Sequence, residues 1–221
     1  MGNNCLQYID KNIIYKSPML QEKSFFAAVA IKGAHIYTFG GFENVEKCQL
    51  KSCESYSIEK DKWSGNEDVQ LHEPRSQASA CQFDESVIFI FGGYNKEAGT
   101  LATIERLDVL KRKMTQIELK MMQPLRRFAT IKISQSKVLI LGGIGRLSKD
   151  TDSVYCFDAS DGDNGSGPTN YSIEVLDKID RAGPVDQPVI LDSIGSLHLF
   201  VENQSGTSPP FRTVYSFLEY S

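Results

Sequence analysis

One short motif occurs three times in this chain: TFGG at 38–41, IFGG at 90–93 and ILGG at 140–143. Each copy ends an apolar run rich in β-favouring residues, and the first glycines of the pairs are 52 and 50 residues apart. Glycine is the usual residue where a strand ends in a turn closed to side chains or where two backbones approach closely. A glycine pair that returns at a fixed period after the same kind of strand indicates a repeat protein.

The repeat extends on both sides of the glycines. Tyr56 follows Gly41 by 15 residues, and Trp63 follows Tyr56 by seven. Leu107 and Met114 take the Tyr and Trp places in the second copy, and Phe157 takes the Tyr place in the third. Upstream, Pro74 and Pro124 each lie 18 residues before the first glycine of a pair, followed soon after by Arg75 and Arg126.

This pattern resembles the kelch repeat, which begins with a Pro-Arg pair and continues with an apolar strand, a diglycine and then a spaced Tyr and Trp. A period near 50 is typical of kelch repeats. The resemblance implies an all-β fold, a β-propeller of four-stranded antiparallel blades, with about four blades in this chain. Its structural residues would be Gly40, Gly41, Tyr56, Trp63, Gly92, Gly93, Gly142 and Gly143. Aromatic side chains such as Tyr56 and Trp63 are expected to fill the space between blades.

The whole chain is interpreted as a single domain, residues 1–221, built from these repeats. A partial repeat covers 1–20, where Tyr8 and Tyr15 share the spacing of Tyr56 and Trp63. Whole repeats cover about 23–71, 73–120 and 121–180, and a degenerate partial repeat covers 181–221. Strands of the last repeat are predicted at 188–191, 197–201 and 212–218, and Val201-Glu202 stands where a diglycine is expected.

This count leaves two arrangements open. A four-bladed ring would close if the N-terminal strands completed the last blade. An open arc, as an incomplete or divergent propeller, would leave blade faces and strand edges exposed, and such surfaces associate. Self-association is therefore expected if the propeller is open.

Composition excludes several classes. The 221 residues carry a net charge of −4, which argues against a general nucleic-acid binder. No apolar run approaches the ~20 residues that a membrane span needs. The N-terminus has no apolar segment of a secretory signal, so a cytoplasmic location is expected, with five reduced cysteines. Lipidation at Gly2 or Cys5 stays open, because Leu6 departs from the myristoylation motif.

The sequence contains few candidate catalytic or metal-binding residues in a recognisable arrangement. Some kelch-type propellers are enzymes, but a copper site needs clustered histidines, and the three histidines His35, His72 and His198 are spread along the chain. No nucleophile triad, phosphate-binding loop or dinucleotide fingerprint occurs. We therefore expect no enzyme activity, no cofactor and no metal. A propeller enzyme with an axial active site remains the alternative, as does a purely structural or decayed paralogue.

The function implied by the kelch resemblance is non-catalytic protein binding, as a recognition platform or scaffold. Substrate recognition for a ubiquitin ligase and binding of a cytoskeletal partner are both within that class. Partners of kelch domains often bind the loops between the second and third strands and the blade-to-blade connections. The loops carry Glu43, Asn44 and Lys47, then Tyr94, Asn95 and Lys96, then Arg146 and Lys149; the connections carry Arg75, Arg126 and Arg127.

Cationic loops on an otherwise acidic chain predict a protein partner with an acidic or phosphorylated segment. The partner-binding residues predicted on this basis are Arg75, Tyr94, Asn95, Arg126, Arg127, Arg146 and Lys149. The alternative interpretation makes Arg75 and Arg126 the structural arginines of the motif.

Overall fold

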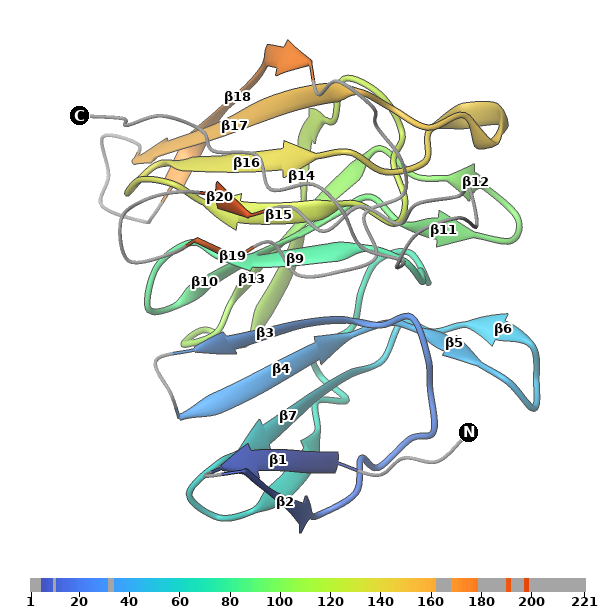
Figure 1. The fold of residues 1–221 in the computed structure, drawn as a ribbon, viewed down its shortest axis with the longest axis vertical. Coiled ribbons are helices and arrows are strands. Elements are labelled where there is room, and N and C mark those ends of the chain that lie inside the picture. The colour runs from blue at the N-terminus through green and yellow to red at the C-terminus, as the bar shows by residue number, and fades with distance from the viewer. Residues whose placement is uncertain are drawn as a thin grey trace.

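The computed structural model describes residues 5–9, 11–31, 34–161, 168–178, 190–191 and 197–198. Apart from one 3-10 turn, all elements described are β-strands (Figure 1). Each whole repeat forms one four-stranded antiparallel sheet, or blade, with its strands in chain order. This confirms the predicted fold class.

Blade one contains β3 (Ala27–Ile31), β4 (His35–Phe39), β7 (Cys53–Ser57) and β8 (Lys62–Gly65). Blade two contains β9 (Ser79–Gln82), β10 (Val87–Phe91), β13 (Thr103–Asp108) and β14 (Lys113–Lys120). Blade three contains β15 (Ala129–Lys132), β16 (Lys137–Leu141), β17 (Ser153–Asp161) and β18 (Pro168–Lys178).

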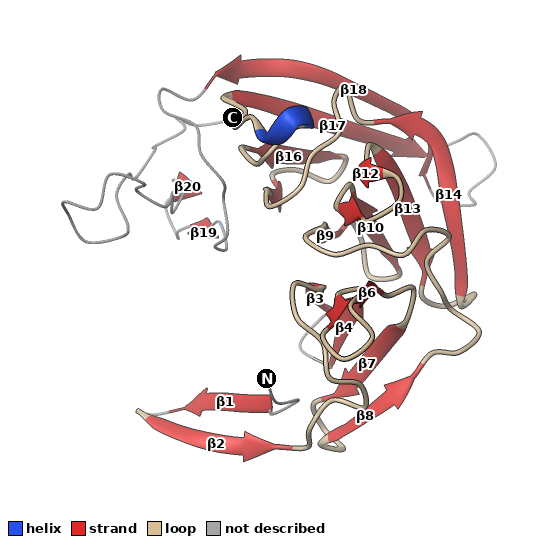
Figure 2. Cartoon of the chain, turned by 90° about the vertical axis from the view of Figure 1, so that its right-hand side faces the viewer, coloured by secondary structure: helices blue, strands red, loops and turns tan. Residues whose placement is uncertain are grey.

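The blades stand side by side along an arc, with β3 and β9 on the inner side (Figure 2), and β9 contacts both β3 and β15. Neighbouring first strands touch, since the Ser79 and Thr130 hydroxyl oxygens are 2.8 Å apart. The N-terminal hairpin of β1 (Cys5–Ile9) and β2 (Asn12–Lys16) lies at the lower end of this arc. The C-terminal pair of β19 (Ile190–Leu191) and β20 (Leu197–His198) is the last element described.

The apolar cores lie between the blades because strand residues alternate between the two faces of a sheet. In β10, Ile88 and Ile90 pack in the core shared with blade one, whereas Phe89 and Phe91 pack in the core shared with blade three. All four side chains are fully buried. The uninterrupted apolar sequence of β10 thus reflects a strand that is covered on both faces.

The first two diglycines bind the backbone of the segment that leads into the next blade. Gly92 has φ +50 and Gly93 has φ +106, and the Gly93 amide donates to the Leu125 carbonyl oxygen at 2.8 Å. The Gly41 amide donates in the same way to the carbonyl oxygen of Arg75 at 2.8 Å. A Cβ atom on Gly92 would lie 2.5 Å from the Leu125 oxygen, so no side chain fits there.

Tyr56 and Trp63 lie opposite each other on β7 and β8, with ring centroids 5.1 Å apart. Both are buried and pack against Met19 and, on β1, Cys5, at the boundary between blade one and the N-terminal hairpin. The Tyr56 hydroxyl donates to the Asp61 carboxylate at 2.6 Å, and this bond contributes most to lowering the pKa of Asp61. The aromatic pair therefore takes the position between sheets that the spacing predicts.

Some elements were not foreseen from the sequence. Two small hairpins, of β5 (Phe42–Glu43) with β6 (Cys48–Gln49) and of β11 (Tyr94–Asn95) with β12 (Gly99–Thr100), follow the first two diglycines. The hairpin of β17 and β18 extends to a pairing of Asp161 with Pro168, beyond the expected strand ends, because backbone pairing continues into a segment of weak β propensity. The strand predicted at 212–218 lies outside the described residues.

Candidate functional site

The loops between the second and third strands gather on one side of the arc, which we call the loop rim. It is formed by the β5–β6 hairpin, the β11–β12 hairpin and the 3-10 turn η1 (Arg146–Ser148), all at the right of Figure 1. The blade-to-blade connections reach the same side, since Ser24, Ser76 and Arg126 form β-bridges with Phe42, Tyr94 and Ile144. Loops and connections therefore form one continuous surface.

Three equivalent residues in these connections adopt left-handed backbone conformations: Phe25 at φ 54, Gln77 at φ 57 and Arg127 at φ 53. Their backbones are joined in series, because the Gln77 amide donates to the Phe25 carbonyl at 2.7 Å and the Arg127 amide donates to the Gln77 carbonyl at 3.0 Å. Left-handed conformations are costly for residues other than glycine and are concentrated at functional sites. No sequence pattern indicates this ladder.

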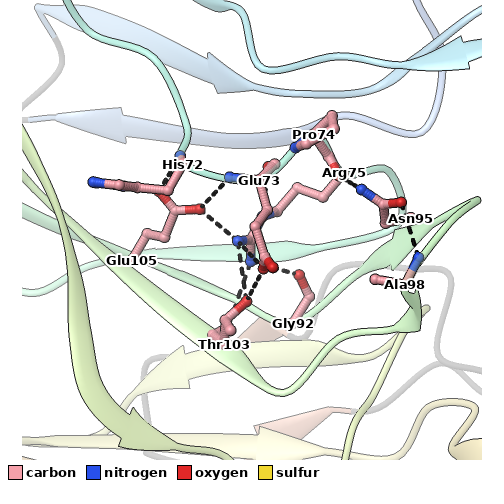
Figure 3. Close-up of polar contacts among 9 residues, drawn as sticks. All are labelled: His72, Glu73, Pro74, Arg75, Gly92, Asn95, Ala98, Thr103 and Glu105. Carbon is pink, nitrogen blue, oxygen red and sulfur yellow. Dashed lines mark hydrogen bonds and ion pairs between the residues drawn. The ribbon is translucent and has the colours of Figure 1, made fainter.

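Arg75 does not lie on the loop rim, and its prediction as a partner-binding residue is wrong. Its side chain is 0% exposed and forms an ion pair with the equally buried Glu105 (Figure 3). The guanidinium also donates to the Gly92 carbonyl at 2.8 Å and to the Thr103 hydroxyl at 3.1 Å. Burial lowers the pKa of Arg75, while Glu105 and Glu73 oppose that shift. The charge of Arg75 is therefore paired, and its guanidinium hydrogen-bonded, inside the protein.

Asn95 is also occupied internally. Its side-chain nitrogen donates to the Pro74 carbonyl at 2.9 Å, and its side-chain oxygen accepts from the amides of Glu97 and Ala98 at 2.8 and 3.2 Å (Figure 3). The residue is buried and shapes the tip of the β11–β12 hairpin. It therefore supports the loop rim and offers no group to a partner.

Arg126 differs from Arg75 because it is not the structural arginine of its repeat. The residue equivalent to Arg75 in the next repeat is Leu125, whose amide and carbonyl make the same bonds: the amides of Arg75 and Leu125 donate to the carbonyls of Leu50 and Leu101 at 3.1 Å each. Tyr155 takes the place of Glu105, and Leu125 and Tyr155 belong to the core between blades two and three. An apolar pair thus replaces the ion pair in blade three.

Arg126 is consequently able to lie on the loop rim. Its guanidinium carbon sits 5.2 Å from the centre of the Tyr94 ring, in cation–π geometry. Its Nη atoms lie 3.3 Å from the Gln77 side-chain oxygen and 3.4 Å from the Ser148 hydroxyl. Its Nε is buried without a hydrogen-bond partner among the described residues, and none of their carboxylates forms an ion pair with it. The side chain is thus held in place, and no carboxylate of the described residues neutralises its positive charge.

The η1 turn beside Arg126 is strained. Leu147 and Ser148 have φ 57 and 55, and the apolar side chain of Leu147 is 90% exposed. Arg146 and Lys149 flank them and are both exposed. The residue types do not predict these left-handed conformations or the exposed leucine beside Arg126. The structure adds Leu147 and Ser148 to the predicted site, together with Gln77, whose side-chain oxygen contacts Arg126.

The two ends of the loop rim differ in charge. The β5–β6 tip carries Glu43, Glu46 and Cys48, the one group of possible metal ligands found among the described residues, with ligand atoms within 4.8 Å of one another. The Glu43 carboxylate already accepts two backbone amides of its own turn, so it acts as a turn cap. The blade-three end carries four cations, Arg126, Arg127, Arg146 and Lys149, beside the exposed Asp150. Of the predicted residues, the structure thus brings together these four and Tyr94.

Comparison with known proteins agrees with the repeat pattern. The KLHDC2/KLHL20/DRC7 Kelch-repeats domain model matches residues 18–169. An F-box/kelch-repeat protein from Arabidopsis thaliana is 40% identical over 83 residues, which cover 37% of this chain and 20% of that protein. Kelch domain-containing protein 2 from Bos taurus is 30% identical over 71 residues, which cover 32% of this chain and 17% of that protein. The matches thus span about a fifth of these relatives.

A solved structure, that of YjhT, superposes with a TM-score of 0.70 at 14% identity, covering 90% of this chain and 66% of that one. This likeness concerns the fold alone. Among the residues that the structure describes, no helix is long and apolar enough to cross a membrane. The family model covers more than half of the sequence, and the chain belongs to the KLHDC2/KLHL20/DRC7 kelch-repeat family.

Proposed function

We propose that this protein is a non-catalytic interaction module that binds an acidic or phosphorylated segment of a protein partner on the loop rim, at the boundary between blades two and three. The observation that carries the proposal is Arg126. It is a guanidinium held by Tyr94, Gln77 and Ser148, none of which supplies a negative charge.

Arg126 lacks a counter-ion among the described residues. A partly buried charge without a counter-ion has lost part of its hydration and has gained only neutral hydrogen bonds. A carboxylate or phosphate would neutralise the charge and accept short, charge-assisted hydrogen bonds. The planar guanidinium can donate to two oxygens of such a group at once. Because Tyr94 and Gln77 already fix the side chain, little conformational entropy is lost when the anion binds.

The residues around Arg126 indicate further features of the partner segment. Arg146 and Lys149 would attract an acidic segment from a distance, an effect that salt screens. Leu147 offers an exposed apolar contact beside the charge. We therefore expect a segment in which an acidic or phosphorylated residue lies next to an apolar one.

Protein recognition of this kind is the role that the kelch family implies. The name of the Arabidopsis relative joins an F-box to kelch repeats, which favours substrate recognition for a ubiquitin ligase as one form of the role. A cytoplasmic location is part of the proposal, since the thiols of Cys53, Cys81 and Cys156 are free and buried, as suits a reducing compartment.

The test compares two double variants. Arg126→Ala with Arg146→Ala removes two cations from the loop rim. Lys111→Ala with Lys113→Ala removes two from the β13–β14 turn, which lies at the opposite end of blade two because strands alternate in direction. Arg112 in that turn is left unchanged because it forms an ion pair with Asp68 at 2.5 Å.

The probe is a panel of synthetic peptides with glutamate, phosphoserine or glutamine beside leucine, measured by fluorescence anisotropy. We expect the parent chain to bind the anionic peptides, more weakly at high salt, and the loop-rim variant to lose at least about tenfold in affinity, the loss of one charge-assisted contact. The Lys111 and Lys113 variant should bind as the parent does. Equal binding of glutamine and anionic peptides, or unchanged binding by the loop-rim variant, would show that the proposal is wrong.

A further inference from the structure

The N-terminal hairpin exposes an apolar surface that neither the fold nor the proposed function uses. In the register of β1 and β2, Leu6 pairs with Tyr15 and Tyr8 pairs with Ile13, so these four side chains share one face. They are 54%, 76%, 70% and 64% exposed, respectively. None is charged, and we call this surface the hairpin face.

The hairpin is held in a definite place by the residues that follow it. The Ser17 amide donates to the Asp61 carboxylate at 3.0 Å, and the Trp63 indole nitrogen donates to the Ser17 carbonyl at 2.9 Å. On the other face of the hairpin, Cys5 packs against the cluster of Met19, Tyr56 and Trp63. The hairpin face therefore points away from blade one in a fixed orientation.

The chain passes from the hairpin into blade one as it passes from each blade into the next. Met19, Leu71 and Met121 occupy equivalent buried positions in the segments that lead into the three blades. The amide that follows donates to a buried carboxylate in two of these segments: Leu20 to Glu54 and His72 to Glu105, each at 2.9 Å. The hairpin thus takes the place of the outer strands of a preceding blade.

Every other boundary of this kind in the described chain holds an apolar core. Blades one and two, and blades two and three, each enclose a cluster of buried apolar side chains. The hairpin face has the composition of such a boundary but is open to solvent. Two tyrosines, a leucine and an isoleucine at these exposures present on the order of 500 Å² per chain, and two such faces together reach about 1,000 Å², the lower limit of a specific interface.

We propose that the hairpin face is a self-association surface that packs against the hairpin face of a second copy of this chain. A two-fold contact brings like residues together, and a face without charges meets no repulsion from its own copy. Tyrosine is favourable at such a contact, because it covers a large area with few rotatable bonds. The expected product is a closed dimer in which the hairpin face of each copy covers that of the other.

This inference does not depend on the proposed function. The hairpin face and Arg126 lie at different ends of the arc, so loss of peptide binding leaves self-association unaffected.

The experiment is sedimentation velocity on the full chain, from low micromolar to hundreds of micromolar. We expect a reversible equilibrium between monomer and dimer. Tyr8→Lys with Tyr15→Lys should abolish the dimer at every concentration, and circular dichroism should show an unchanged fold, because both side chains are largely exposed. The single variant Tyr15→Lys should weaken the dimer in the same direction if the double variant does not fold.

The matched control is Val45→Lys with Leu110→Lys, which changes two other exposed apolar residues outside the hairpin. This variant should form the dimer as the parent does. A parent that stays monomeric at hundreds of micromolar, a dimer that survives the tyrosine substitutions, or a dimer lost equally in the control would overturn the proposal. A monomeric parent whose melting temperature falls with the tyrosine substitutions would overturn it too, and would show that another part of the chain covers the face.

Discussion

The connections into blade two and blade three have the same backbone but opposite side-chain chemistry. Each contains one residue, the connecting residue, whose carbonyl oxygen accepts the amide of the preceding diglycine at 2.8 Å. In blade two the connecting residue is Arg75, paired with Glu105 inside the protein. In blade three the equivalent residues are Leu125 and Tyr155, which pack in an apolar core.

The two connections share a backbone contact, which the fold requires, and differ in their side chains, which the fold allows to vary. The carbonyl and the glycine that receives it are common to both boundaries, so the backbone contact holds neighbouring blades together. The connecting side chain and its partner need only to be compatible with each other, either as an ion pair or as an apolar pair. Buried ion pairs can often be replaced by apolar pairs of similar volume without loss of stability, and the chain contains both solutions. Where the apolar pair is used, the next residue, Arg126, is available to the surface.

Blade one provides a third version. Lys23 and Glu54 occupy the ion-pair positions, with their charged atoms 3.0 Å apart and both side chains buried. Neither of those two atoms makes a hydrogen bond of good geometry among the described residues. A lysine is a point charge and lacks the planar fork that lets Arg75 reach Gly92 and Thr103 as well. The connecting position therefore accepts lysine, arginine or leucine.

The largest expected effect concerns the shared backbone contact. Gly92→Val places a branched side chain at φ +50, where a Cβ atom would lie 2.5 Å from the Leu125 oxygen and 2.6 Å from the Met121 methyl carbon. Backbone strain and the clash together should cost about 4 kcal/mol or more of unfolding free energy. Gly65→Ala is the control, because the nearest neighbour of its Cβ atom would be 3.7 Å away. Thermal melts that coincide for parent and Gly92→Val would refute the role given to the diglycine.

A smaller but still large effect is expected at the side chains of blade two. Arg75→Leu leaves the Glu105 carboxylate buried without its counter-ion, which should cost about 3–5 kcal/mol in urea unfolding. Leu125→Ala in blade three should cost about 2–5 kcal/mol through a cavity instead. The two can be told apart by a second substitution: Glu105→Tyr removes the buried carboxylate and should relieve part of the Arg75→Leu defect and none of the Leu125→Ala defect.

The smallest stability effect is expected at Arg126. Arg126→Ala removes a cation–π contact with Tyr94 and two long hydrogen bonds, together worth about 1 kcal/mol or less. Urea unfolding should therefore be nearly unchanged, although peptide binding is lost. A loss of stability as large as that of Arg75→Leu would make Arg126 a second structural arginine.

Much of the fold was accessible from the sequence because it depends on local signals. The strands His35–Phe39 and Val87–Phe91 have the bounds that their apolar runs predict, and each ends at a glycine pair. The pairing of Leu107 with Met114 follows from the same seven-residue spacing as Tyr56 and Trp63. Such features repeat in register, so each copy supports the others.

The candidate site was less accessible, because it depends on one-residue differences and on backbone geometry. Arg75 lies 17 residues before the first glycine of its pair, as Lys23 does, whereas Arg126 lies 16 before its own. That single step distinguishes a buried arginine from a surface one, and counting back from Gly142 would have found it. No comparable signal marks the left-handed conformations of Phe25, Gln77 or Leu147.

The most direct test of the relation between the two connections is to place the blade-three solution in blade two. The free energy of unfolding is measured for the parent, Arg75→Leu, Glu105→Tyr and the double variant. If the connecting side chain and its partner need only to satisfy one another, the double variant should recover more than half of the loss seen in Arg75→Leu, with a coupling energy of about 1–3 kcal/mol. A double variant no more stable than the sum of the two single losses would contradict this, and would show that the fold of blade two requires the arginine itself.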